Sequence, residues 1–334
     1  MNLVTGATGH IGNVLVRELV SRGQKVRALI LPGEDTTPLI GLDIEMVKGN
    51  VLDPQSIQPA FEDIQDVYHL AGIISILPGK NDLVHRVNVQ GTKNVLQAAR
   101  LSRVRRLIYT SSIHAITRAP HGICIDETLP FDPYNPVGAY DRSKAEASLA
   151  VLDTVEQGLD AVIVCPTGVI GPYDYRRSEM GQLIQECAEN KPQLYVDGAY
   201  DFVDVRDVAQ GHILACQKGK TGESYILSGE RITVRRLMET IWEITGFHSI
   251  HFKVPFGLAK FFAQFTPLYY RLAKARPRLT TYSLETLVSN SVISHEKARQ
   301  ELGYMPRSLR ESIADTIRWF RENSHLWTKA TKAI

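Results

Sequence analysis

The sequence predicts an α/β protein with a doubly wound parallel sheet and a smaller, irregular α/β lobe. Three observations lead to this fold class. Short apolar runs alternate with amphipathic segments through the first half of the chain. A glycine-rich turn separates the first apolar run from the first amphipathic segment. Beyond Pro166 the alternation gives way to shorter and less regular elements.

The first half of the chain contains the regular alternation of strands and helices. Strands are expected at Asn2–Thr5, Lys25–Ile30, Ile44–Lys48, Asp66–Leu70, Arg105–Ser111 and Ala161–Cys165. Helices are expected at His10–Arg22, Pro54–Phe61, Asp82–Leu101 and Gly138–Glu156. Because right-handed crossovers join strands that alternate with helices, these strands form a parallel sheet with helices on both faces.

The second half predicts a smaller lobe that is interleaved with the end of the first domain. Helices are expected at Met180–Asn190, Val205–Gln217, Val234–Thr245, His295–Leu302 and Leu309–Phe320. Short strands are expected at Leu194–Val196 and Asp201–Asp204, and Glu223–Leu227 is expected to join the large sheet. We therefore expect a larger domain over residues 1–170 and about 200–228, and a smaller lobe over about 171–199 and 229–330.

The composition is that of an ordinary globular protein, with 44% hydrophobic and 22% charged residues. The 334 residues suffice for a large core and two lobes. Basic and acidic side chains nearly balance, 38 against 36, so the charge gives no reason to expect a nucleic-acid partner. The four cysteines lie far apart without a C-x-x-C pair, which predicts buried, reduced side chains and neither a metal cluster nor a disulfide framework; they are Cys124, Cys165, Cys187 and Cys216.

Neither a secretory signal peptide nor a bilayer-spanning stretch is predicted, so we expect a cytoplasmic protein without stable membrane insertion. The segment Val254–Arg278 is apolar and aromatic and ends in four basic residues. Such a segment can lie on a membrane surface. The balanced charge of the whole chain favours a wall of the substrate pocket or a subunit contact instead.

The glycine-rich run Thr5–Gly12 follows the first strand and opens the first helix. A glycine turn lets the backbone approach a pyrophosphate, and a helix N-terminus offers unpaired N–H groups and partial positive charge. The run has the spacing G-x-x-G-x-x-G, through Gly6, Gly9 and Gly12. It predicts a dinucleotide site, although a strand–helix turn that is merely rich in glycine stays open at this point.

A second pattern lies early in the helix expected at Gly138–Glu156. Tyr140 and Lys144 are four residues apart and therefore share a helix face. A free tyrosine has a pKa of about 10, and a neighbouring ammonium favours the phenolate and lowers that pKa. The hydroxyl-rich segment Thr110–Ser112 ends an expected strand, which is where ligands bind in such sheets. Together these side chains predict acid–base chemistry at the sheet edge.

In combination these features resemble the extended short-chain dehydrogenase/reductases, a superfamily that includes the NAD-dependent epimerases and dehydratases. The chain is most similar to their dihydroflavonol-4-reductase-like branch, from Asn2 to about Phe320. The segments that carry the likeness are Thr5–Gly12, His69–Gly72, Asn88–Thr92, Tyr109–Ser112, Tyr140–Lys144, Pro166–Pro172 and Asp204–Ala209. The resemblance implies a Rossmann fold and an NAD(P)-dependent enzyme.

The resemblance also implies roles for individual positions. Ser112 would hydrogen-bond the substrate oxygen, Tyr140 would donate or remove the proton, and Lys144 would hold the nicotinamide ribose and tune Tyr140. Asn88 would support the active site. The implied cofactor contacts are Gly6, Thr8, Gly9, His10, Ile11, Gly12, Leu31, Asn50, Val51, Leu70, Ala71, Gly72, Thr110, Tyr140, Lys144, Pro166, Thr167 and Val169. The implied chemistry is hydride transfer at the nicotinamide C4 beside proton transfer through Tyr140.

One departure from the family pattern concerns the choice between NAD and NADP. Leu31 ends the second strand, where an aspartate would bind the adenosine ribose of NAD. Arg27 lies nearby, but so do Glu34 and Asp35, which either repel a phosphate or hold a ribose hydroxyl. We therefore expect NAD(P), with a slight lean to NADP.

Other departures concern the adenine and the substrate. Asn50 stands where the family usually places an aspartate against the adenine amine, and its amide oxygen can accept the same hydrogen bond. Asp53 is expected to cap a helix rather than to contact the cofactor. Cys165 and Ile170 replace an arginine and a tyrosine typical of nucleotide-sugar enzymes, and the residues after the catalytic serine lack the acidic groups of a 4,6-dehydratase.

These observations favour a NAD(P)H-dependent reductase of a ketone or aldehyde in a small hydrophobic or polycyclic molecule, with steroid dehydrogenation as a variant. The alternative is an NAD-dependent sugar epimerase. A non-catalytic NAD(P)-binding regulatory protein is disfavoured because Tyr140 and Lys144 are both present. The resemblance further implies a homodimer that pairs the helices at Asp82–Leu101 and Gly138–Glu156.

Overall fold

The computed structural model describes residues 1–75, 81–247, 251–266 and 280–328. Within these residues the largest sheet has seven strands in the order β3-β2-β1-β4-β5-β6-β10, and every neighbouring pair is parallel. The strands are β1 (Asn2–Thr5), β2 (Val26–Ile30), β3 (Glu45–Lys48), β4 (Asp66–His69), β5 (Arg106–Thr110), β6 (Ala161–Pro166) and β10 (Ser224–Leu227). This order reverses at β1 and β4, so the expected doubly wound parallel sheet is confirmed.

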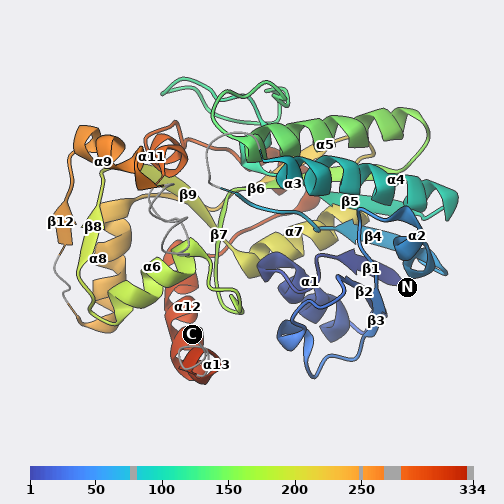
Figure 1. Cartoon of the computed structure of the whole chain (residues 1–334), viewed down its shortest axis with the longest axis horizontal. Helices are drawn as coiled ribbons and strands as arrows, with labels where there is room; N and C mark the ends of the chain where they lie inside the picture. The colour runs from blue at the N-terminus through green and yellow to red at the C-terminus, as the bar shows by residue number, and fades with distance from the viewer. Residues whose placement is uncertain (76–80, 248–250, 267–279, 329–334) are drawn as a thin grey trace.

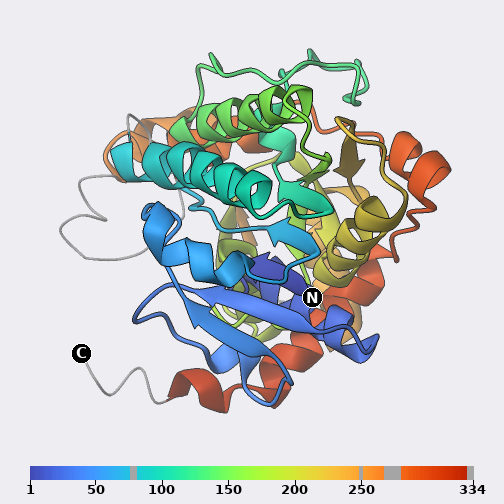
Figure 2. The same ribbon diagram turned by 90° about the vertical axis from the view of Figure 1, so that its right-hand side faces the viewer.

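Helices cover both faces of this sheet (Figure 1 and Figure 2). One face carries α1 (His10–Ser21), α7 (Val205–Lys218) and the π-helical turn η5 (Ala298–Leu302). The other face carries α2 (Pro54–Ile57), the 3₁₀ turn η2 (Gln58–Phe61), α3 (Asp82–His85), the π-helical turn η3 (Arg86–Gly91), α4 (Thr92–Leu101) and α5 (Ala139–Glu156). Shorter 3₁₀ turns are η1 (Thr37–Leu39) and η4 (Ile113–Ala115).

The central strands are buried on both faces because each face packs against helices. Successive side chains alternate between the two apolar cores. Leu3 of β1 and Leu107 of β5 pack into the core beneath α4 and α5. Their neighbours Val4 and Ile108 pack into the core beneath α1 and α7. Two cores on opposite faces hold the sheet rigid and fix the positions of its strand ends.

The remaining elements form a smaller lobe beside the carboxyl ends of the strands (Figure 1). It contains a sheet of three strands in the order β11-β9-β7 and a parallel pair β12-β8. These strands are β7 (Gly168–Ile170), β8 (Gln193–Tyr195), β9 (Ala199–Asp204), β11 (Glu230–Thr233) and β12 (His251–Lys253). The helices are α6 (Glu179–Ala188), α8 (Val234–Thr245), α9 (Phe256–Ala263), α11 (Thr281–Leu287), α12 (Leu309–Glu322) and α13 (His325–Thr328).

Several expected elements differ in detail from those observed. The helix expected at Asp82–Leu101 is interrupted by the π-helical turn η3, and the helix expected at Pro54–Phe61 ends as the 3₁₀ turn η2. The segment His295–Leu302 forms mainly the turn η5. The prediction that all four cysteines are buried is wrong for Cys124, which is exposed, although all four are free. Residues 267–278 of the apolar and basic segment Val254–Arg278 lie outside the described residues.

Candidate functional site

The glycine turn between β1 and α1 is tight at two positions. Gly6 has φ +68°, and a Cβ there would lie 2.7 Å from the Ala71 nitrogen. A Cβ on Gly12 would lie 2.1 Å from the Gly6 carbonyl oxygen. Gly9 is the N-cap of α1, has no side chain to cap it, and is followed by a first turn without acidic residues. The turn therefore presents helix N–H groups to a ligand, as an anion site requires.

The other positions expected to contact the cofactor follow the ends of six adjacent strands. These positions are Thr8, His10 and Ile11 after β1; Leu31 after β2; Asn50 and Val51 after β3; Leu70, Ala71 and Gly72 after β4; Thr110 at the end of β5; and Pro166, Thr167 and Val169 at the end of β6 and in β7. Because the strands are parallel, their carboxyl ends meet at one edge of the sheet. The structure thus brings all of these positions to that edge.

A charged cluster lies beside the glycine turn, at the end of β2. The Glu34 carboxylate accepts hydrogen bonds from the Thr8 hydroxyl at 2.6 Å and from the Leu31 backbone N–H at 3.2 Å. Arg176 pairs with Glu34 and also donates to the Thr8 hydroxyl oxygen at 2.9 Å. Glu34 was a candidate from the sequence, whereas Arg176, which comes from the smaller lobe, was not.

Arg27 does not belong to this cluster. Its guanidinium donates to the Ala60 and Glu62 carbonyl oxygens at 3.1 and 2.6 Å and pairs with Glu45 at 2.9 Å. The side chain ties β2 to β3 and to the turn η2 on one face of the sheet. Its role is therefore structural, and it is not a ligand for a phosphate at the end of β2.

After β3, Asp53 caps a helix, as the sequence predicts. The Asp53 carboxylate caps α2 by accepting hydrogen bonds from the backbone N–H groups of Gln55 and Ser56. The Asn50 amide oxygen accepts the Leu52 N–H at 3.0 Å. A carbonyl-type oxygen has two lone pairs, so Asn50 can accept one further hydrogen bond.

Tyr140 and Lys144 lie on the first turns of α5, and Ser112 follows β5. All three side chains are buried. The Lys144 ammonium donates to the Thr110 carbonyl oxygen at 2.6 Å, and the Tyr109 hydroxyl is 3.5 Å away. A Cβ on Gly72 would lie 3.6 Å from the Lys144 nitrogen, so this ammonium borders the segment after β4.

Burial shifts the pKa values of both Tyr140 and Lys144. It raises the pKa of Tyr140 to about 12, against a smaller lowering by a hydrogen bond with Ser112. It lowers the pKa of Lys144 to about 8, because a buried ammonium loses its hydration. The expected lowering of the Tyr140 pKa is therefore wrong for this structure. The reason is that desolvation dominates, while the ammonium is directed at the Thr110 carbonyl.

Asn88 links the segment after β4 to α5. Its amide oxygen accepts the Ile73 N–H at 2.8 Å. Its amide nitrogen donates to the Ile73 carbonyl oxygen at 3.0 Å and to the Ser143 hydroxyl at 2.9 Å. Ser143 donates in turn to the Tyr140 carbonyl oxygen at 2.8 Å. Asn88 therefore fixes the helix that carries Tyr140 against the expected cofactor segment.

Two hydroxyls among the expected cofactor contacts already have partners in the fold. The Thr110 hydroxyl bonds the buried His212 ring nitrogen Nε2 at 2.7 Å. The Thr167 hydroxyl donates to Asp201 at 2.6 Å. His10 also has a structural partner, the Pro172 carbonyl oxygen at 2.9 Å. These side chains hold the sheet edge together. A contact of these residues with the cofactor would therefore be made by their backbone groups.

A buried polar network beside Ser112 was not predicted from the sequence. The His114 ring nitrogen Nε2 and the Tyr200 hydroxyl are 2.6 Å apart. The Tyr282 hydroxyl donates to Asp141 at 2.6 Å. The rings of Tyr200 and Tyr282 both pack against His114. The contacts join α5 and η4 of the large domain to β9 and α11 of the smaller lobe. Long sequence separations hide such a network from motif analysis.

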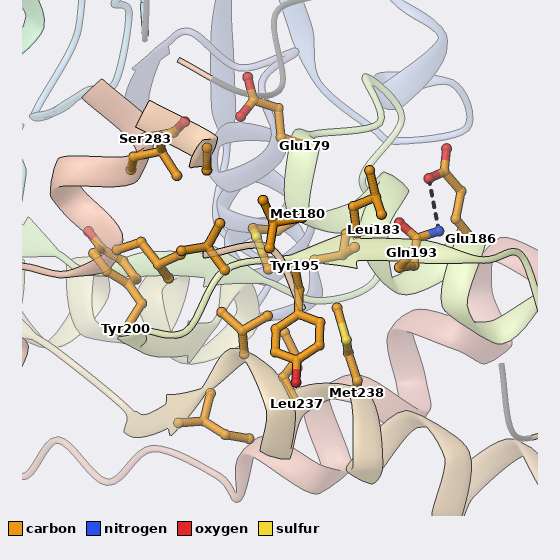
Figure 3. A pocket seen from close by; sticks show the side chains of 18 of the residues that line it. Glu179, Met180, Leu183, Glu186, Gln193, Tyr195, Tyr200, Leu237, Met238 and Ser283 are labelled. Carbon is orange, nitrogen blue, oxygen red and sulfur yellow. Dashed lines mark hydrogen bonds between the residues drawn. The ribbon is translucent and has the colours of Figure 1, made fainter. Parts of the chain in front are cut away.

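An apolar cavity of about 820 Å³ lies within the smaller lobe, next to this network (Figure 3). Its wall is formed by α6, β8, β9, α8, α9 and α11 and includes Met180, Phe202, Leu237 and Met238. Tyr200 also lines it. The cavity thus has the size and apolar lining of a small-molecule site, for which about 300–1,000 Å³ is typical.

Two kinds of feature are absent from the described residues. No three side chains among His, Cys, Asp and Glu are arranged to hold a metal ion. Among the helices in the described part of the chain, none combines the length and apolarity needed to cross a bilayer.

The close glycine turn and the uncapped N-terminus of α1 fit a dinucleotide pyrophosphate. Together with Ser112, Tyr140 and Lys144 at the same edge of a doubly wound sheet, they define an NAD(P)-dependent enzyme of the extended short-chain dehydrogenase/reductase type. The chain belongs to the NAD-dependent epimerase/dehydratase family, whose model matches residues 2–228.

Individual relatives agree with this assignment over nearly the whole chain. Sterol demethylase protein B of Methylococcus capsulatus is 38% identical over 322 residues, which cover 96% of this chain and 98% of that protein. A Synechocystis sp. protein provisionally named dihydroflavonol 4-reductase is 32% identical over 330 residues, covering 98% and 96%. The crystal structure of gox2253 superposes with a TM-score of 0.85 at 34% identity, covering 97% of this chain and 98% of that one.

Proposed function

We propose that this protein is a NAD(P)H-dependent oxidoreductase that reduces a ketone or aldehyde of an apolar molecule, with Tyr140 as the acid. The apolar cavity that meets the buried network beside Ser112 is the observation that carries this proposal. The names of the two relatives refer to a sterol and to a dihydroflavonol, which supports a ring-containing substrate. An epimerase of nucleotide sugars would need polar partners where this cavity has Phe202, Leu237 and Met238.

In this proposal the Ser112 hydroxyl binds the carbonyl oxygen and Tyr140 donates a proton to it. The raised pKa of Tyr140, about 12, keeps the phenol protonated at neutral pH, which suits the acid needed for reduction. Lys144 holds the ribose hydroxyls, and its charge favours the phenolate that forms as the proton leaves. When bound, the nicotinamide supplies the hydride.

The test is turnover by the Tyr140→Phe variant. With a panel of apolar ketones and NADH or NADPH, we expect its kcat to fall about 10²- to 10⁴-fold, the usual contribution of a positioned acid. Nucleotide affinity, measured by calorimetry, should stay near that of the wild type. Tyr304→Phe, which removes a buried hydroxyl that donates to the Ser228 carbonyl oxygen, is the matched control. Near-normal kcat in Tyr140→Phe would refute the assignment.

A nucleotide-release assay separates the reductase from the epimerase alternative. An epimerase reduces and reoxidises its cofactor within one turnover and keeps it bound. The purified protein is denatured and the supernatant is assayed for NAD. A stoichiometric release of NAD together with no consumption of added NADPH would favour the epimerase, whereas net oxidation of NADPH by the ketone panel supports the proposal.

For the cofactor we propose NAD(P), with a slight preference for NADP. The preference rests on Leu31, which leaves the end of β2 without a carboxylate. Arg176 supports this lean, because a guanidinium beside Thr8 can pair with a 2′-phosphate. Glu34 opposes it through like-charge repulsion. The ratio of kcat/KM for NADPH and NADH measures the balance, and a ratio well below one would contradict the lean.

The division into a nucleotide-binding domain and a substrate lobe, with the boundaries expected from the sequence, is part of the same proposal. So is a homodimer through the outer faces of α4 and α5, where Leu101 is exposed. Light scattering that gives the mass of a monomer would exclude the dimer. A cytoplasmic location, which fits four free cysteines, can be checked by cell fractionation.

A further inference from the structure

The smaller lobe exposes an apolar patch at its outer edge. In and just after α9, Leu258, Phe261, Phe262 and Phe265 are between 50% and 58% exposed. The three phenylalanine rings touch, with centroids 5.6 Å apart for Phe261 and Phe262 and 5.4 Å apart for Phe261 and Phe265. Single exposed apolar side chains are normal, but a contiguous cluster marks an interaction surface. We call these four residues the phenylalanine patch.

The strand pair β12-β8, whose second strand in the chain leads into α9 (Figure 1), carries two more exposed apolar side chains. Phe252 and Leu194 are paired in register on these strands and are 58% and 73% exposed. Six of the ten phenylalanines of the chain fall within residues 247–265. This concentration makes the edge of the lobe far more aromatic than the rest of the protein.

The patch also borders the substrate cavity. Leu194, Leu258 and Phe262 line that cavity and are at least half exposed, so they mark where its wall meets solvent. Ala259, one residue from Leu258, is buried on the inner side of α9. One short helix therefore forms cavity wall on one side and exposed aromatic surface on the other.

The sequence that contains the patch is basic, unlike the chain as a whole. Residues 244–284 contain no Asp or Glu but six Lys and Arg, so the remainder of the chain has a net charge of −4. Four of the six cations fall in residues 267–279, outside the described residues. Of the other two, Lys253 pairs with Asp197 and Lys260 with Glu285, and both pairs are largely solvent-exposed. Exposed pairs are worth little and are readily exchanged for other anions.

We propose that the phenylalanine patch docks on the surface of an anionic lipid bilayer and that the cavity receives its apolar substrate there. Aromatic side chains insert at the boundary of headgroups and acyl chains, and neighbouring cations attract anionic headgroups. The part of the inference that concerns substrate entry rests on the proposed function. The docking itself does not, because it depends only on the exposed rings and on the excess of Lys and Arg in the sequence of residues 244–284.

The balance of charge over the whole chain argued against a membrane surface, but that average conceals a segment of 41 residues without an acidic side chain. The pocket-wall interpretation and the surface interpretation are compatible, because Leu258 and Phe262 line the cavity whereas Phe261 and Phe265 do not. A second copy of the chain on the patch is the competing occupant and becomes an outcome of the test.

The test is flotation with vesicles of phosphatidylcholine, with and without phosphatidylglycerol. We expect the full-length protein to float with the anionic vesicles and much less with the neutral ones. The double variant Phe261→Ser/Phe265→Ser should lower the partition coefficient at least about tenfold, because it removes two rings that insert and do not line the cavity. Ile40→Ser, which removes an exposed apolar side chain of the large domain, is the control and should float like the wild type.

The outcomes separate docking from the proposed function. Failure of the wild type to float with either vesicle, or flotation unchanged in the double variant, would overturn the docking. A dimer by light scattering that becomes a monomer in the double variant would assign the patch to a subunit contact and would also overturn it. Melting temperature and nucleotide affinity check that the variant is folded. Reduction of water-dispersed ketones by the double variant at the wild-type rate would leave the proposed function intact whichever way flotation turns out.

Discussion

Replacing Lys144 with methionine should remove an unfavourable charge from the core. The side chain is only 6% exposed, and its ammonium neighbours are a carbonyl oxygen, a hydroxyl and the Tyr109 ring, none of which carries a negative charge. Burial lowers its pKa from 10.5 to about 8. At about 1.4 kcal/mol for each pKa unit, the charged form costs the folded protein about 3 kcal/mol near neutral pH.

The sign of the pH dependence follows from this lowered pKa. Below pH 8 both folded and unfolded chains hold the Lys144 proton, so the full penalty is present. Between about pH 8 and 10.5 the unfolded chain binds more protons than the folded one, and stability therefore rises with pH. From pH 7 to 9.5 this single group should stabilise the wild type by about 2 kcal/mol relative to a variant without it.

The assay is urea unfolding of wild type and Lys144→Met at several pH values, without added nucleotide. Methionine leaves the Thr110 carbonyl without its donor, which costs about 1–3 kcal/mol and offsets part of the gain at pH 7. The difference between the two proteins should nevertheless shift by about 2 kcal/mol in favour of the wild type by pH 9.5. Tyr140 and Cys165, which lie near Lys144, have pKa values of about 12 in the folded protein and therefore stay protonated up to pH 9.5.

Lys218→Met is the matched control. Lys218 also donates to a backbone carbonyl, that of Leu302 at 2.9 Å, but it lies at the surface. Its difference from the wild type should stay constant over this pH range. Parallel stability curves for the wild type and Lys144→Met would refute the argument that Lys144 is held at a desolvation cost.

Two further predictions concern the nucleotide site. Glu34→Gln should raise the ratio of kcat/KM for NADPH over NADH about tenfold, because relief of one like-charge repulsion at an exposed site is worth about 1–2 kcal/mol; steady-state kinetics with both nucleotides measures it, and an unchanged ratio would show that Glu34 does not face the 2′ position. Gly12→Ala should lower nucleotide affinity about 100-fold or more in calorimetry, because its Cβ would lie 2.1 Å from the Gly6 oxygen and force the turn apart. Gly257→Ala, where a Cβ meets no atom within 4 Å, is its control, and equal affinities in the two variants would mean that the tight turn is not used.

The large sheet was predictable because its signals are local and strong. Each central strand is a continuous apolar run between a glycine or polar turn and an amphipathic helix, and six expected strands match observed ones to within a residue or two. The strands β7, β8 and β12 have only three residues each, too few to show a period. The break in the helix at Arg86–Gly91 was also hidden, because the hydrogen bonds of Asn88 to Ile73 and Ser143 are tertiary.

The residues of the candidate site show the same difference between local motifs, which could be predicted, and tertiary contacts, which could not. The glycine turn and the Tyr140–Lys144 face are short motifs whose geometry follows from one turn and one helix. The pairs Glu34–Arg176, His114–Tyr200 and Asp141–Tyr282 are separated by 142, 86 and 141 residues, so no spacing rule connects them. The direction of the Tyr140 pKa was missed for a related reason. The helix places the ammonium nearby, but only the packed structure shows how deeply the phenol is buried.

The buried network beside Ser112 is where the two halves of the molecule meet. On one side, the sheet edge supplies groups whose positions depend on β5 and α5, with Asn88 fixing the helix. On the other side, Tyr200 comes from β9 of the smaller lobe and lines its apolar cavity. In the proposed function the chemistry depends on the sheet edge and the substrate on the lobe, so the cavity lining can change without moving Tyr140. The motifs that identify this family therefore carry no information about its substrates, and the side chains around the cavity and the phenylalanine patch are where substrate choice must be sought.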